Sequence, residues 1–588
     1  MKYVMTVSAM SVAIPRRVLR QRKLNPDFTA EILLLALSCD HLNQGRASRR
    51  PPASPAPEHD PPPAPGPPNR ATRPEADPAG PEAATSEKSS RGPRLQNVEW
   101  IEEQTIAELR SAMETSERTA VEITEAYLER IERIDPDLRS IVEVNPDARS
   151  IASDLDAERA AGSIRGPLHG IPIVLKENID TADSMLTTAG SLALVESMPT
   201  TDSTTASRLR AAGAVILGKA GMSEWAFFRS SGGSSGWSAR NGQVRNPYDP
   251  ARTTGGSSSG SGASPSANLT AAAIGTETDG SIVSPANANG IVGLKPTVGL
   301  TSRAGVIPIS GTQDTIGPLA RTVADAAAVL TALAGSDPRD QATAAADRQM
   351  ASDYTAFVGD GGLETARIGL ATAFLGKSKK TDAVLRNAVE SMTSAGAVIV
   401  DVPELAESKQ LSDAKMKVLL FEFKVHLAEY LATRTAGSPR TLADIIEFDQ
   451  INSAVEMIHF DDDLHQLAQA TDGLDSDEYL LARRTARRLG AEEGIDRVLD
   501  EHDVVAIIAP TGPPAPMIDW VNGEHRILGS SSHAAAAGYP LISVPAGYIA
   551  GLPVGITFMG TAWSEPTLLR LSSAFEHARG PRTPPLQR

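Results

Sequence analysis

A run of glycine and serine, "GGSSSGSGAS" at residues 255–264, is the stretch on which the interpretation of this sequence depends. Taken alone, such a run is typical of a flexible linker, because glycine and serine bury little apolar surface. Its surroundings give it a different context. Turn-like residues precede it, and "NLTAAAIGTETDGS" at 268–281 follows it with an apolar segment that leads into a tight polar turn.

The segments around this run predict the fold class. Several short segments are apolar without alternation, which is typical of strands covered on both faces in an α/β protein. Helix-forming segments separate them, and two capping-box patterns, "TIAE" at 105–108 and "TAVE" at 119–122, mark helix starts. We therefore expect one large α/β domain over residues 98–580, with a mostly helical part from about 404 to 500. The strand-like segments lie at 171–175, 214–217, 367–375, 397–402, 504–510 and 541–547.

The first 97 residues differ in composition from the rest. Residues 51–93 hold 14 of the 42 prolines and no Val, Ile, Leu, Phe, Tyr or Trp, so they cannot nucleate a core. We predict that residues 1–97 form a disordered extension and that residues 581–588 form a flexible tail. A basic cluster followed by "ILLLAL" at 32–37 and Cys39 weakly resembles an export or lipid-anchor signal. The aliphatic run is too short to span a bilayer, which needs about 20 apolar residues, and we expect a cytoplasmic protein.

Composition and motif spacing argue against several classes of function. The formal net charge of −16 disfavours binding to nucleic acid, and the single cysteine excludes a disulfide or a Cys-rich metal site. A match to a phosphate-binding loop at 213–219 is followed by alanine, which lacks the hydroxyl that binds magnesium. No histidine lies between His169 and His426, which disfavours a Ser-His-Asp triad. The G-x-S-x-G matches at 232–236 and 256–260 resemble the nucleophile elbow of a hydrolase, but such an elbow needs a buried strand directly before it, which these matches lack. We expect no metal and no organic cofactor.

The turn "TETDGS" at 276–281 has the properties of an oxyanion site. Its small residues let backbone N–H groups point at one spot, and Ser281 places a hydroxyl where they converge. A serine needs a base before it can attack a carbonyl, and a lysine can serve if desolvation lowers its pKa from about 10.4. Lys176, which follows the apolar segment 171–175, is the conspicuous candidate.

Four other polar residues are expected to be solvated or structural. Glu277 and Asp279 form a carboxylate pair in the turn, but loop carboxylates are usually solvated, and we expect no catalytic role for them. His169 and His533 fit hydrogen-bonded core positions better than catalytic ones.

Together, these pieces resemble the amidase signature family. The resemblance covers roughly residues 100–580, and Ser257 precedes Ser281 by 24 residues, as the two-serine arrangement of the family requires. It implies a single domain built on a central mixed β-sheet covered by helices. The motifs that carry it are the Gly-Ser run, "LHGIPIVLKENIDT" at 168–181, "GTETDGSIVSPA" at 275–286 and "GLKPTVGLTSRAGVIP" at 293–308.

The same resemblance implies a Ser-Ser-Lys mechanism without metal or cofactor. Ser281 would be the nucleophile and neutral Lys176 the base. Ser257 would bridge them, next to a cis peptide bond between Gly256 and Ser257, and Ser258 would support the relay. The backbone N–H groups that would hold the oxyanion are those of Thr278, Asp279, Gly280 and Ser281.

One position departs from the family pattern. Asp279 stands where glycine is usual, and "GTETDGS" is similar to the subgroup of bacterial peptide amidases, as is the sequence at 223–250. This implies a small-molecule or short peptide amide as substrate, cleaved at a C-terminal amide to the acid and ammonia through an acyl-enzyme. Amidases of aryl, aliphatic or fatty amides are the alternative. The A-type component of a tRNA-dependent amidotransferase and a non-catalytic binding protein are weaker alternatives, and both monomer and homodimer stay open.

Overall fold

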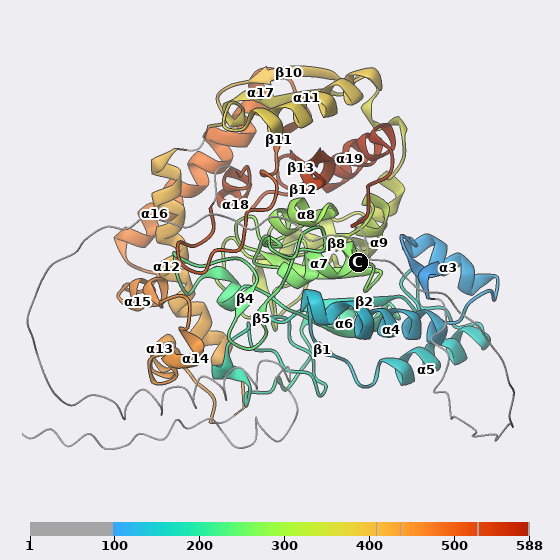
Figure 1. The fold of residues 1–588 in the computed structure, drawn as a ribbon. Coiled ribbons are helices and arrows are strands. Elements are labelled where there is room, and N and C mark those ends of the chain that lie inside the picture. Colours follow the sequence, from blue (N-terminus) through green and yellow to red (C-terminus); the bar gives the residue numbers. More distant parts are fainter. Residues whose placement is uncertain (1–97, 407, 436, 526–528, 586–588) are drawn as a thin grey trace, which may run out of the picture. The chain divides into compact units, whose positions relative to one another are not determined.

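One sheet of eleven strands forms the centre of the fold. The computed structural model that shows it describes residues 98–406, 408–435, 437–525 and 529–585 (Figure 1), so the extension predicted over residues 1–97 lies outside the described residues. The strands are β1 (Ile141–Val144), β2 (Pro172–Lys176), β3 (Val215–Ala220), β6 (Ala272–Glu277), β7 (Val292–Lys295), β8 (Thr315–Ala320), β9 (Arg367–Ala371), β10 (Val398–Val402), β11 (Ala506–Pro510), β12 (Leu541–Ile549) and β13 (Leu552–Met559).

The sheet is mixed, as predicted. Its strands lie in the order β1-β3-β2-β6-β8-β7-β12-β13-β11-β9-β10. β2 is parallel to β3 and β6, and β9 is parallel to β10 and β11, whereas the other neighbouring pairs are antiparallel. β2, β3, β6 and β8 are buried along their whole length, which explains why their sequences are not alternating.

Helices cover the sheet and connect its strands (Figure 1). Thr105 and Thr119 form the two predicted capping boxes, and the part from 404 to 500 is mostly helical, as expected. Among the described helices, none combines the length and the apolar sequence that a bilayer span requires. The α-helices of six or more residues are α3 (Ile106–Glu114), α4 (Ala120–Leu138), α5 (Ala148–Ala160), α6 (Thr204–Ala211), α7 (Ser259–Ser266), α8 (Val283–Asn289), α9 (Val323–Leu333), α11 (Lys379–Ser394), α12 (Lys409–Ala432), α13 (Leu442–Ile451), α15 (Asp463–Gln469), α16 (Asp477–Arg487), α17 (Arg497–His502), α18 (Ser532–Ala537) and α19 (Glu565–Arg579).

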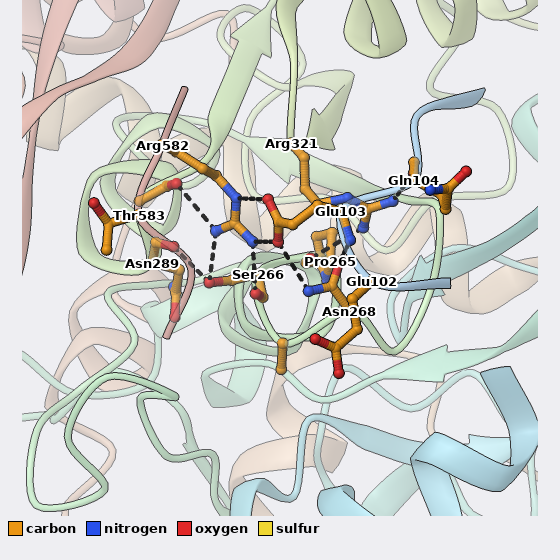
Figure 2. Close-up of polar contacts among 12 residues, drawn as sticks. Glu102, Glu103, Gln104, Pro265, Ser266, Asn268, Asn289, Arg321, Arg582 and Thr583 are labelled. Atoms are coloured by element: carbon orange, nitrogen blue, oxygen red, sulfur yellow. Dashed lines mark hydrogen bonds and ion pairs between the residues drawn. The ribbon is translucent and has the colours of Figure 1, made fainter. Parts of the chain in front are cut away.

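Arg582 fixes the end of the described chain to the start of the domain. Its guanidinium donates to the Glu103 carboxylate (Nε to Oε2, 2.9 Å) and to the Ser266 carbonyl oxygen (2.9 Å), as Figure 2 shows. It also donates to the Gly290 carbonyl oxygen at 3.4 Å. Ser266 ends α7 and Gly290 caps α8, so one side chain joins the ends of both helices. The first residues of the segment expected to be a tail are therefore held in place.

Replacing Arg582 by methionine is expected to lower the stability of the domain by about 1–3 kcal/mol, because several hydrogen bonds to a buried charged group are lost at once. The Arg582 side chain is almost fully buried, so solvent cannot replace these bonds. The apparent melting temperature of Arg582→Met should fall relative to that of Arg386→Met, which alters an exposed arginine of α11. Equal melting temperatures for the two variants would show that the Arg582 contacts contribute nothing.

Candidate active site

The Gly-Ser run belongs to the domain interior and is not a linker. Residues 255–258 lead into α7 at Ser259, and every residue of α7 is buried. Gly260 shows why small residues are needed. A Cβ atom there would lie 2.2 Å from the Ser140 carbonyl oxygen and 2.6 Å from the Gly221 nitrogen. The run therefore packs a helix directly against two neighbouring stretches of backbone, one of them just after β3.

Lys176 ends β2 and is fully buried. Its Nζ lies 2.8 Å from Ser257 Oγ, 2.8 Å from Thr276 Oγ1 and 3.3 Å from the Thr276 carbonyl oxygen. Asn178 Nδ2 donates to the same Thr276 hydroxyl at 3.1 Å. β2 and β6 are parallel neighbours, so Lys176 and Thr276 meet where these two strands end. Burial disfavours the ammonium form and lowers the pKa of Lys176 from 10.5 to about 7, against the opposing effect of two nearby carboxylates.

Two adjacent serines of the run lie beside Lys176. The peptide bond between Gly256 and Ser257 is cis, as expected, and Ser257 is buried. Ser258 Oγ donates to the Thr276 carbonyl oxygen at 3.0 Å. The N–H of Ser258 donates to the Ser281 carbonyl oxygen at 3.2 Å. Ser258 therefore joins the end of β6 to the turn that carries Ser281.

Ser281 lies in the turn between β6 and α8 and is 8% exposed. Within the described residues the Ser281 hydroxyl forms no hydrogen bond. Ser281 is connected to the serines beside Lys176 by the main-chain hydrogen bond from the N–H of Ser258. The structure thus brings Lys176, Ser257 and Ser258 together with Thr276. The transfer of a proton from Ser281 to Ser257 stays a prediction.

Glu277 anchors the turn from inside the protein. It is 1% exposed, so the expectation of a solvated carboxylate is wrong for this residue. Its carboxylate accepts the N–H groups of Gly280 (2.9 Å), Ile282 (2.7 Å) and Val283 (3.1 Å), and burial raises its pKa. The N–H of Gly280 is therefore already engaged, which removes it from the donors predicted for the oxyanion.

Side-chain contacts also hold the other residues of the turn. Thr278 Oγ1 donates to Asp314 Oδ1 at 2.5 Å. The Asp279 carboxylate forms an ion pair with Lys415 of α12 and accepts a hydrogen bond from Ser531 Oγ at 2.6 Å. Asp279 is thus bound by protein groups, and the expectation that solvent surrounds it is wrong as well.

A cavity of about 750 Å³ lies next to this group. Asn178, Thr276 and Thr278 line it where the strands end. Sequence reasoning missed Asn178 and Thr276, although both lie within a few residues of predicted site residues. It also missed the contribution of α12, which follows Lys176 by more than 200 residues and carries no catalytic motif. The α12 residues that line the cavity are Glu422, His426, Glu429 and Tyr430.

The two histidines that were expected to be structural are buried. His169 Nε2 lies 2.9 Å from the Leu155 carbonyl oxygen. His533 lies in α18, and burial lowers its pKa to about 4, so it is uncharged at neutral pH. Across the parts of the chain that the structure describes, no group of three or more His, Cys, Asp or Glu side chains is arranged to hold a metal ion.

Known proteins are similar to this chain over most of its length. A family model described as Amidase matches residues 122–569. A probable amidase of Arabidopsis thaliana is 39% identical over 503 residues, which cover 84% of this chain and 93% of the relative. The A-type component of glutamyl-tRNA(Gln) amidotransferase from Chloroflexus aurantiacus is 34% identical over 496 residues, 81% of this chain and 98% of the relative. The X-ray structure of peptide amidase from Stenotrophomonas maltophilia matches with a TM-score of 0.78 and 48% identity, over 83% of this chain and 99% of that chain.

Proposed function

This chain belongs to the amidase signature family, and we propose that it cleaves the C-terminal carboxamide of peptides through a Ser281–Ser257–Lys176 relay. As a member of that family it is an amidohydrolase, an enzyme that breaks a linear carbon–nitrogen amide bond. The observation that carries the proposed relay is the 2.8 Å contact between Lys176 Nζ and Ser257 Oγ in a fully buried site.

The hydrogen-bond partners of Lys176 can accommodate a neutral amine. A neutral amine has two N–H donors and one lone pair, whereas an ammonium has three donors and no lone pair. Thr276 offers two acceptors to Lys176 Nζ, its hydroxyl oxygen at 2.8 Å and its carbonyl oxygen at 3.3 Å. When these take the two donors, the lone pair faces Ser257 Oγ and can accept its proton. A pKa of about 7 supports this, because much of the lysine is then neutral near pH 7.

In the proposed first step, Ser281 Oγ attacks the carbonyl carbon of the substrate amide. The proton of Ser281 passes to Ser257, and the proton of Ser257 passes to Lys176 Nζ. Negative charge develops on the carbonyl oxygen, where N–H groups of the turn stabilise it. With Gly280 engaged by Glu277, the donors proposed for this task are those of Thr278, Asp279 and Ser281.

The second half of the proposed reaction uses the same groups in reverse. The carbon–nitrogen bond of the tetrahedral intermediate breaks, and the relay returns a proton to the leaving nitrogen, which departs as ammonia. Water then attacks the Ser281 ester while Lys176 again accepts a proton through Ser257. The ester bond breaks, Ser281 regains its proton, and the free acid leaves.

The substrate proposal has two supports. The chain is 48% identical to the peptide amidase and 34% identical to the amidotransferase component, and Asp279 in its turn fits the peptide amidase pattern. The cavity of about 750 Å³ lies in the size range of ligand sites, about 300–1,000 Å³, and its lining combines apolar side chains such as Ile307 and Ile309 with polar and charged ones. Arg303, Glu422 and His426 are among the charged and polar lining residues, and such groups suit a peptide better than a fatty acyl chain.

A panel of amides is expected to separate the proposed substrate from the alternatives. A short peptide amide should have a kcat/KM about 10-fold or more above that of aryl and fatty amides of similar size, because polar groups of the cavity stay unpaired with an apolar acyl chain. Mass spectrometry and an ammonia assay should show one ammonia for each free acid, with internal peptide bonds intact. Preference for aryl or fatty amides would refute the peptide substrate and leave the relay untouched.

A further inference from the structure

His426, on the α12 wall of the cavity, holds a hydrogen-bond donor that the described protein groups do not use. Its Nδ1 accepts the N–H of Gly311 at 3.0 Å. Because a backbone N–H can only donate, Nδ1 carries no proton, and the proton of the neutral imidazole is on Nε2. His426 is partly buried and lines the cavity, and its Nε2 forms no hydrogen bond to any residue that the structure describes.

Gly311 holds the imidazole ring in place. A Cβ atom at position 311 would lie 2.4 Å from His426 Cε1 and 3.0 Å from each ring nitrogen, so only glycine allows the ring to come this close. The Gly311 carbonyl oxygen accepts a hydrogen bond from the guanidinium of Arg303, which also donates to Asp340 (Nε to Oδ2, 2.8 Å). Gly311 is thus fixed through both its N–H and its carbonyl group. The ring is therefore oriented before a substrate arrives.

The loop that carries Gly311 also contacts the turn that carries the proposed nucleophile. Asp314 Oδ1 accepts a hydrogen bond from Thr278 Oγ1 at 2.5 Å, and Asp314 Oδ2 accepts the N–H groups of two other residues of the loop at 2.8 and 2.9 Å. Residues 303–312 all line the cavity. The turn and His426 therefore belong to one cavity, and the same loop is bonded to both.

This arrangement has the dimensions of a short peptide. Gly311, which binds His426, and Asp314, which binds the turn, are three residues apart, and three residues of chain span at most about 10 Å. A peptide of about three residues, bound with its C-terminal amide at the turn, is long enough to bring an upstream carbonyl group to His426.

The other polar residues of α12 that line the cavity are engaged or lack a donor. Glu422 is fully buried and accepts a hydrogen bond from the Tyr479 hydroxyl at 2.5 Å. The Tyr430 hydroxyl donates at 2.8 Å to an aspartate that follows β2. The Glu429 carboxylate can only accept. Of these side chains, His426 is the one that can donate to a ligand.

The group that fits a neutral N–H donor is a carbonyl oxygen. A peptide carries one at every residue, whatever its side chains are, and the amidated end of a peptide has no carboxylate. An aryl or fatty acyl chain has no such acceptor beyond the amide that reacts. A donor at this distance from the turn therefore favours peptides over the other classes of amide.

We propose that His426 is a substrate-binding residue that determines specificity, because its Nε2–H donates to a backbone carbonyl oxygen upstream of the amide that is cleaved. This inference rests on the proposed function and extends it by naming the residue that recognises the peptide chain.

The test compares His426→Asn with the unchanged chain on a tripeptide amide and on the amide of its last amino acid. Asparagine can keep an acceptor near the position of Nδ1 for the Gly311 N–H, but it has no N–H at the position of Nε2. The ratio of the two kcat/KM values, tripeptide amide to amino acid amide, should fall about 5- to 10-fold. The loss should appear mainly in KM, because the lost bond is made equally in the bound substrate and in the transition state.

Two further variants separate the donor from other effects of the change. His426→Gln can place an N–H near the position of Nε2, and it should restore most of the ratio. His502→Asn makes the same change at a histidine of α17 that contacts Glu404 at 3.1 Å and lies outside the cavity lining, and it should leave the ratio unchanged. The apparent melting temperature of each variant is measured alongside. A purely structural disturbance would slow both substrates and leave their ratio as it was.

Changes in the substrate test the same bond from the other side. Two analogues of the tripeptide amide each carry an (E)-alkene in place of one peptide bond, which removes that carbonyl group and keeps the shape of the chain. With the unchanged chain, one analogue should have a kcat/KM about 10-fold below that of the parent peptide. With His426→Asn, the same analogue and the parent should differ by less than about twofold, because the bond is already lost.

The outcomes distinguish this inference from the function on which it rests. If the unchanged chain releases no ammonia from any peptide amide, the proposed function fails and this inference fails with it. If it releases ammonia and His426→Asn keeps the ratio of the unchanged chain, this inference alone fails. Equal losses to the analogue in both proteins would also overturn it. If His426→Asn does not fold, the unchanged chain decides: a loss for one analogue supports the inference, and two analogues as fast as the parent contradict it.

Discussion

Ser281→Ala is expected to lower kcat for peptide amide hydrolysis by about 100,000-fold or more, because it removes the atom that forms the acyl-enzyme. The same variant should lose labelling by a fluorophosphonate, whose phosphorus reacts with an activated serine. Initial rates of ammonia release and intact-protein mass spectrometry measure the two effects.

The matched control for this variant is Ser284→Ala. Ser284 lies one turn further along the same segment and is exposed, so its hydroxyl has no part in the proposed relay. The Ser284→Ala protein should be labelled by the fluorophosphonate and should turn over substrate like the unchanged chain. A Ser281→Ala protein that still forms a covalent adduct on another serine would assign the nucleophile elsewhere.

Lys176→Ala is expected to lower kcat by about 10,000-fold or more, at the upper end of what a general base contributes.

The rate of the unchanged enzyme should also rise with pH. The pKa of Lys176 is lowered to about 7, and only the neutral amine accepts a proton. The rate is therefore expected to be low at pH 6, to increase through pH 7 and to level off above pH 8. Lys176→Ala should lack this rise.

Lys219 provides a control for the effect of losing a buried lysine. It is fully buried on β3, its pKa is lowered to about 8 by burial, and its ammonium contacts the Ile179 carbonyl oxygen and Thr187 instead of a serine of the relay. In Lys219→Met the rise through pH 7 should persist. If the rise through pH 7 is lost in Lys219→Met and kept in Lys176→Ala, then Lys219 is the titrating group and Lys176 is not the base.

The sequence allowed a close prediction of the parts of the site that depend on local motifs. Lys176 at the end of an apolar strand and the Gly-Ser run both lie where they were expected, because strand burial and tight backbone packing leave clear patterns of residue types. β1, β6, β7, β8 and β13 escaped identification as strands. All of them except β1 contain glycine or proline, which weakens the strand signal.

Contacts between distant residues could not be predicted in this way. Asp279 and Lys415 are 136 residues apart, and Glu103 and Arg582 are 479 apart. In each case a charged side chain looks solvated in the sequence, and only the fold shows its partner. The engagement of the Gly280 N–H is different, since Glu277 lies three residues away. There the backbone geometry of the turn decides which N–H group points inward, and residue types alone do not specify that geometry.

The order of the strands has a consequence for how the chain is made. β12 and β13 pair with β7 on one side and β11 on the other, so the middle of the sheet consists of strands from residues 541–559. The ribosome produces these residues after every other strand. Until they emerge, the nascent chain must carry two unfinished half-sheets, one ending at β7 and the other at β11. Each has an open edge that could pair with another chain. Protection by chaperones should therefore matter most in the last stage of synthesis.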